Sequence, residues 1–135
     1  MAVDYYSLIK DMLTRVEAEI ATTLGYTVIY ENTQNAIPSD ALWIRAVTRP
    51  GETIQASLGE SPRYRTTGIL IFQIFGDIEK GQKTALEAAT AVASKFRHIT
   101  IDNTLYRSPS VEIIGRDRNF WQVNVSCPFQ HDDFI

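Results

Sequence analysis

The chain has 135 residues, of which 44% are hydrophobic and 21% charged, and this balance excludes an intrinsically disordered protein. Its net charge of -3 argues against a general nucleic-acid binder, which would carry a basic face. The single cysteine, Cys127, excludes an internal disulfide, and no apolar run approaches the ~20 residues of a membrane span. The length fits one domain over 1–135. Because no signal peptide is visible, we expect the protein to be made and used in a cytoplasm.

Two segments show the three-to-four-residue apolar spacing of amphipathic helices. The first spans residues 4–24, where Asp4 is a suitable N-cap and Gly25 a suitable left-handed C-terminal residue. The second spans residues 82–97, and its alanines would allow close approach to a sheet. Their apolar faces hold Tyr5, Leu8, Ile9, Met12, Leu13, Val16, Ile20 and Leu24 in the first, and Ala85, Leu86, Ala89, Val92, Ala93 and Phe96 in the second.

The segments between and after the helices are rich in strand-forming residues. Residues 66–76 have apolar side chains on both faces, which indicates a central strand covered on two sides. Arg49-Pro50-Gly51-Glu52 has the composition of a β-turn, so we expect a hairpin of residues 42–48 and 53–58. The further strands expected are 26–30, 99–101, 110–114 and 120–129, with a turn at 115–119 and a polar tail from Gln130 to Ile135.

This order of elements predicts an α+β fold in which two helices pack on one face of an antiparallel sheet. Seven residues are expected to form a mutually packed core: Leu70, Phe72, Ile74, Val92, Phe96, Trp121 and Val123.

Catalytic and metal-binding signatures are absent from the sequence. It has no phosphate loop, dinucleotide-binding fingerprint or nucleophile elbow. His131 with Asp132 and Asp133 is better interpreted as a solvated tail than as a metal site, and Cys127 alternates with apolar neighbours as a core residue does. We therefore expect no enzyme activity, no cofactor and no metal.

Arginines and tyrosines cluster around the predicted hairpin and the last turn. Two interpretations stay open: ordinary solubility of a sheet edge, or an interface with an acidic protein surface, for which Arg and Tyr are the enriched types. The candidate interface residues are Arg49, Arg63, Tyr64, Arg65, Arg116 and Arg118.

A series of short motifs resembles one protein family. It comprises the Pro-Gly segment 47–52, Gln-Ala-Ser-Leu-Gly at 55–59, Arg-x-Arg-Thr-Thr-Gly-Ile-Leu at 63–70, an alanine-rich helix ending at Phe96, and the segment 121–129. In this order, over nearly the whole chain, the motifs resemble the tail-terminator-like family of tailed bacteriophages. No single motif is diagnostic, and the resemblance rests on their sequence along the chain.

The resemblance implies a structural virion protein without catalysis or cofactor. Members of the family form hexameric rings that bind the end of the completed tail tube, stop its polymerisation and present a surface for head attachment. The implied partners are further copies of the chain, the tail tube protein and the head–tail connector or neck proteins. Neither a membrane nor direct sequence-specific nucleic-acid binding is implied. Three other interpretations stay open: a neighbouring head–tail joining or neck protein, a small enzyme with a site between subunits, and a monomeric binding module.

Overall fold

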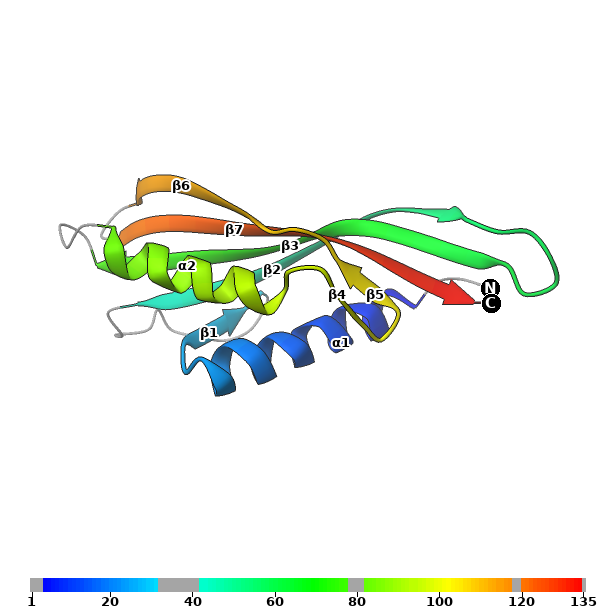
Figure 1. Cartoon of the computed structure of the whole chain (residues 1–135), viewed down its shortest axis with the longest axis horizontal. Coiled ribbons are helices and arrows are strands. Elements are labelled where there is room, and N and C mark those ends of the chain that lie inside the picture. Colours follow the sequence, from blue (N-terminus) through cyan, green and yellow to red (C-terminus); the bar gives the residue numbers. More distant parts are fainter. Residues whose placement is uncertain (1–3, 32–41, 78–81, 118–119, 135) are drawn as a thin grey trace.

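The computed structural model describes residues 4–31, 42–77, 82–117 and 120–134, which form two helical segments and a curled mixed sheet (Figure 1). This arrangement agrees with the α+β class. The elements are α1 (Tyr5–Val16), the π-helical continuation η1 (Glu17–Thr23), β1 (Thr27–Tyr30), β2 (Trp43–Gln55), β3 (Arg63–Asp77), α2 (Lys83–Lys95), β4 (Ile99–Ile101), β5 (Thr104–Tyr106), β6 (Ser110–Asp117) and β7 (Phe120–Phe134).

Both predicted helices are confirmed, together with the ends of the first. The Asp4 carboxylate accepts a hydrogen bond from the Ser7 amide at 3.1 Å and so caps α1. Gly25 follows η1 with a φ of +77°, the left-handed conformation that glycine adopts without strain. The last seven residues of the first segment, 17–23, are wound as a π-helix, which the apolar spacing did not indicate.

The sheet has the strand order β1-β2-β3-β7-β5-β4, and β6 also pairs with β7. One edge of β7 therefore faces β3, and the other is shared by β6 along residues 120–126 and β5 along residues 129–131. The prediction of an antiparallel sheet is wrong at one pair, because β1 and β2 run parallel. Twelve residues separate these strands, enough for the crossover that a parallel pair needs.

The predicted turn at Arg49-Pro50-Gly51-Glu52 is wrong, because β2 continues through these residues to Gln55. The register between β2 and β3 shifts at a bulge between Pro50 and Thr53. The bend of the hairpin lies at residues 56–62. The Thr48 amide points to the outer edge of β2, where it donates to the Glu31 carboxylate at 3.2 Å. The nitrogen of Pro50, two residues on, lies at the same outer edge, so its missing N–H costs the β2–β3 ladder nothing.

The predicted polar tail is also wrong, because β7 extends to Phe134 and residues 130–134 pair with β3. The same extension gives Gln130 and His131 partners in β5, a strand that the sequence pattern did not reveal. The central strand predicted at 66–76 is confirmed and extends from Arg63 to Asp77.

One hydrophobic core contains the buried faces of both helices and alternate residues of the central strands. Leu70, Phe72 and Ile74 of β3 are fully buried in it, as are Val123 and Val125 of β7. Six of the seven predicted core residues belong to this cluster, and the seventh, Trp121, is partly buried and packs against it, so the predicted core is confirmed.

The opposite face of the sheet carries a second, smaller aromatic group. Trp43 and Phe75 stack with ring centroids 4.3 Å apart, and the Phe120 ring meets the Trp43 ring edge-on. The Arg45 guanidinium lies 5.4 Å from the centroid of the Phe75 ring.

Candidate functional site

The hairpin of β2 and β3 extends past both helices as an arm, which we define as residues 49–69 (Figure 1). The end of β7 accompanies it, with Pro128–Phe134 paired to Arg63–Ile69. The arm holds four of the six candidate interface residues, namely Arg49, Arg63, Tyr64 and Arg65.

Arg63 and Arg65 lie on the same face of β3 and both approach the carboxylate of Asp132 on β7. Arg65 binds it in a forked arrangement, with Nε 3.0 Å from Oδ1 and Nη2 3.4 Å from Oδ2. The Nε of Arg63 lies 3.8 Å from Oδ2. The hydrogen bond to Asp132 raises the pKa of Arg65. Two guanidiniums share one carboxylate, so one positive charge is unmatched within this cluster.

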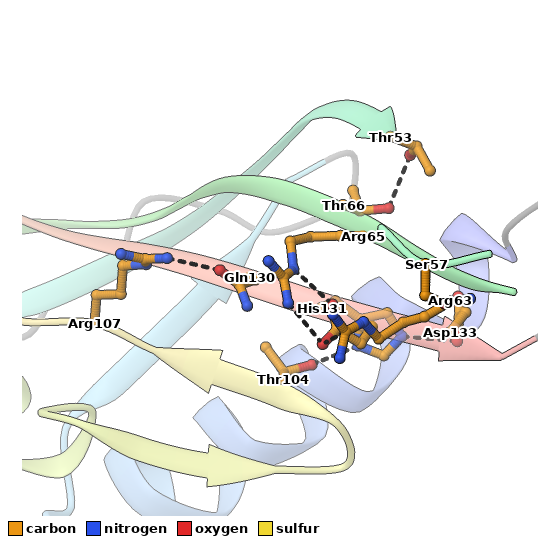
Figure 2. A network of polar contacts seen from close by, with 11 residues as sticks. Thr53, Ser57, Arg63, Arg65, Thr66, Thr104, Arg107, Gln130, His131 and Asp133 are labelled. Atoms are coloured by element: carbon orange, nitrogen blue, oxygen red, sulfur yellow. Dashed lines mark hydrogen bonds and ion pairs between the residues drawn. The ribbon is translucent and has the colours of Figure 1, made fainter. Parts of the chain in front are cut away.

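The opposite face of the arm is built around His131. Its Nδ1 lies 2.7 Å from the Thr104 hydroxyl oxygen, and its Nε2 lies 3.0 Å from a carboxylate oxygen of Asp133 (Figure 2). The His131 side chain is buried, because β5 pairs with β7 beside it. Tyr64 shares this face, opposite Asp133 in the β3–β7 register. The expected solvated tail is therefore a paired strand with specific polar contacts.

Threonines connect the arm to the first helix. The hydroxyls of Thr53 and Thr66 lie 2.8 Å apart across β2 and β3, and the Tyr5 hydroxyl of α1 lies 2.5 Å from that of Thr53. The start of α1 and the arm are thus joined by side-chain hydrogen bonds.

Arg49 lies at the base of the arm and is paired inside the chain. Its Nη1 lies 2.8 Å from the Glu31 carboxylate, and this hydrogen bond raises the pKa of Arg49 and lowers that of Glu31. The Arg49 side chain remains 62% exposed.

Arg116 is exposed on β6, opposite Trp121 of β7, whereas Arg118 lies outside the described residues. Trp121 and Phe134, the register partner of Arg63, are thirteen residues apart on β7. At ~3.3 Å per residue this separation is roughly 40 Å. The structure therefore places Arg63 and Arg65 together on one face of the arm and Tyr64 on the other face, whereas Arg116 lies at the far end of the molecule.

Exposed apolar side chains form a further surface feature that the charge pattern did not indicate. On the arm, Leu58 is 91% exposed and Ile54 is 51% exposed. On β6, Val111, Ile113 and Ile114 are 45–50% exposed. Ile54, Ala56 and Leu58 alternate in the sequence, but nothing there indicated that Ile54 and Leu58 would stay uncovered by the described part of the chain.

An open groove of about 660 Å³ runs along the outer side of α1. Ile9, Leu13 and Ala18 line it together with Tyr30 of β1, whose hydroxyl donates to the Glu17 carboxylate at 2.5 Å. Burial and this contact raise the pKa of Tyr30. The lining is mostly apolar and offers no convergent set of polar groups.

The described residues contain no group of three or more His, Cys, Asp or Glu placed to hold a metal ion. Cys127 is fully buried, and burial raises the pKa of its thiol to about 12, so it carries no thiolate at neutral pH. None of the helices in the described part of the chain is long and apolar enough to cross a membrane.

Comparison with known protein families matches residues 8–129 to the model of the phage tail terminator protein. The chain belongs to this family. The resemblance seen in the ordered motifs is thus confirmed, and the membership indicates a phage tail structural protein that interacts with other tail or head proteins.

No curated protein matches the chain. Eight chains of solved structures do match, and one of them superposes with a TM-score of 0.63 at 19% identity, covering 88% of this chain and 92% of the other. A likeness at this level of identity shows that the two chains share a fold.

Proposed function

We propose that the chain is a single-domain ring subunit that caps the end of the completed tail tube. Six copies form the ring, which stops polymerisation of the tube and provides the surface for head attachment. The family match over residues 8–129 is the observation that carries this proposal. The ring acts as part of the virion after assembly in the host cytoplasm.

The distribution of surface features supports a subunit with several partners. Arg63 and Arg65 lie on the arm, whereas Arg116 lies at the opposite end, so one partner of ordinary size does not reach both groups. A ring subunit between a tube and a head connector, with neighbours on two sides, needs separate contact surfaces of this kind. A head-to-tail contact that closes on itself also gives a ring of identical copies.

Removal of the gene tests the proposal directly. A phage with a stop codon early in the gene, grown in a non-suppressing host, should produce tails longer than normal and without heads in negative-stain electron micrographs. Expression of the intact chain from a plasmid should restore normal length. Tails of normal length that lack heads would instead assign the chain to head–tail joining, and normal virions would overturn both assignments.

The ring is tested separately by its copy number. A reconstruction of tails bearing the chain should show six copies at the head-proximal end, and any other number contradicts the hexamer. Purified protein that stays monomeric until tails are added is consistent with assembly on the tube as a template.

We further propose that Arg63 and Arg65 contact another subunit or the tube, through the positive charge that Asp132 leaves unbalanced. Substitution of both by glutamate would place three carboxylates together on this face of the arm, so glutamine is the cleaner exchange. The Arg63→Gln/Arg65→Gln variant should retain its circular dichroism spectrum but fail to cap tails. Lys83→Gln is a matched control, because this exposed cation lies on α2 in the body of the molecule. A double variant that yields normal virions removes these arginines from the interface.

A further inference from the structure

The outer edge of β2 is protected against pairing with another strand. Beyond Ala46 it has no strand partner among the described residues, since β1 pairs only with residues 43–46. Along the first part of this free edge the Thr48 amide is bonded to Glu31, Pro50 offers no N–H, and the bulge between Pro50 and Thr53 breaks the register. These are devices by which proteins prevent edge-to-edge association.

The outer edge of β6 is less protected, because its own bulge lies between Ile113 and Gly115, at the end of the apolar segment. Within the described part of the chain no strand pairs with it, and Ser110–Ile114 contains neither proline nor lysine. Val111 and Ile113 lie opposite the core residues Val125 and Val123 of β7, so they continue the apolar core face to the rim of the sheet. Both side chains remain about half exposed. A β-branched apolar edge of this kind is a template for an added strand.

The tip of the arm offers a strand with matching character. Past the bulge, Thr53–Gln55 pairs with β3 on one side, and a hydrogen bond from the Ala56 amide to the Arg63 carbonyl at 2.7 Å continues this pairing. The other side of the segment has no strand partner among the described residues. The side chains of Ile54 and Leu58 in this segment are exposed. Leu58, with 91% of its surface exposed, is the most exposed of the large hydrophobic side chains described.

We propose that the outer edge of β6 accepts Thr53–Leu58 from the arm of a second copy of the chain as an added strand. Ile54 and Leu58 then lie beside Val111 and Ile113, and the backbone groups of both edges gain partners. The inference rests on the proposed ring function, because it names the contact between adjacent subunits of that ring.

The pairing is intermolecular and directional. The β6 edge and the arm tip lie in different halves of the molecule: Glu112 is opposite Asn124 of β7, and Ile54 is aligned through Arg65 with Asp132. These two β7 residues are eight positions apart, roughly 26 Å by the strand rise. One copy therefore does not satisfy both surfaces, and each copy is a donor on one side and an acceptor on the other, as a closed ring requires. A six-residue strand contact lies below the ~800 Å² per partner of a typical stable complex, so two copies alone stay dissociated. Ring closure gives every copy two such contacts.

Engineered cysteines test the proposed contact. In phage particles, a chain carrying Ile54→Cys with either Val111→Cys or Ile113→Cys should form a ladder of disulfide-linked species under oxidation, ending at the closed ring. The buried Cys127 is left in place, and each single-cysteine variant serves as its control. Ile54→Cys with Lys83→Cys should give no ladder, because Lys83 is exposed on α2 and is not part of the proposed strand contact. Dimers from Val111→Cys alone would indicate β6 pairing with itself and would overturn the proposal.

A charged edge tests the same contact without cross-linking. Val111→Lys/Ile113→Lys should keep the circular dichroism spectrum and melting temperature of the parent, because both side chains are about half exposed, yet should lose tail capping. Tyr6→Lys, on the 74% exposed side chain of α1, is the control and should cap normally. Normal virions from the double variant would overturn the strand contact. The stop-codon phenotype is independent of this result, so a failed strand contact is distinguishable from a failed terminator function.

Discussion

Replacement of Phe72 by alanine tests whether the core depends on the facing of β3 described above. Phe72 is fully buried, its ring lies 5.3 Å from that of Phe96, and Phe96 in turn lies 5.2 Å from Tyr106. Truncation of a buried phenylalanine removes its transfer free energy and leaves a cavity, at a cost of ~3–5 kcal/mol. With an unfolding entropy of ~2.1 cal/mol/K per residue over 135 residues, this loss lowers the melting temperature by roughly 11–18 °C.

The assay is thermal unfolding followed by far-ultraviolet circular dichroism, with urea unfolding as a second measurement of the free energy. Ile69→Ala is the matched control, because Ile69 lies on the same strand but on the other face and is 41% exposed. Its cost should stay below ~2 kcal/mol. Equal losses in the two variants, or a loss for Phe72→Ala of less than ~1 kcal/mol, would refute the assigned facing of the strand.

Three further changes probe the arm and the buried thiol. Gly68→Ala should destabilise the fold by ~1–3 kcal/mol in urea, because its Cβ would lie 2.6 Å from the Arg49 carbonyl oxygen; Gly76→Ala, whose nearest contact would be 3.6 Å, should cost less. Burial raises the pKa of Cys127 from 9 to about 12, so the native thiol should resist Ellman's reagent until urea unfolds the chain. Since the folded state retains this proton where the unfolded chain loses it, stability should fall as the pH rises above 9, less steeply in Cys127→Ala. Asp132→Asn should speed hydrogen exchange at residues 63–66 while leaving α2 unchanged, and an unchanged arm would contradict the shared-carboxylate arrangement.

Periodicity was sufficient to predict the parts of the fold that one buried face determines. Leu70, Phe72 and Ile74 alternate with their neighbours because β3 has a period of two, and the same holds for Val123 and Val125. The N-cap at Asp4 follows from local chemistry alone. These features depend on residues close together in the chain, so the sequence pattern contains them.

The errors lie where tertiary context overrides a local signal. Pro50 and Gly51 have the composition of a turn, but at the outer edge of β2 the proline is compatible with a continuous, bulged strand. His131 and Asp132 are polar enough to predict a tail, whereas Thr104 and Arg65, distant in sequence, provide the partners that keep them in a strand. The parallel β1–β2 pair depends on a connection whose path no local pattern specifies.

The candidate site was predicted in part for the same reason. Residue type singled out Arg63 and Arg65 as candidate interface residues, and the structure places them on one face of β3. Their acceptor within the chain, Asp132, could not be predicted, because the pairing depends on the register between β3 and β7. The exposed edge of β6 could not be predicted either, since exposure depends on which strands lack a neighbour.

The position of β7 has a consequence for the order of folding. It follows every other described strand along the chain, yet it lies between β3 on one side and β5 and β6 on the other. Until β7 emerges from the ribosome, the edge of β3 that pairs with it has no strand partner, and β5 and β6 lack the strand with which both of them pair. The nascent chain therefore passes through a stage with open strand edges, in which association with other chains competes with folding. Completion of the body and completion of the arm occur together, when this one strand is inserted.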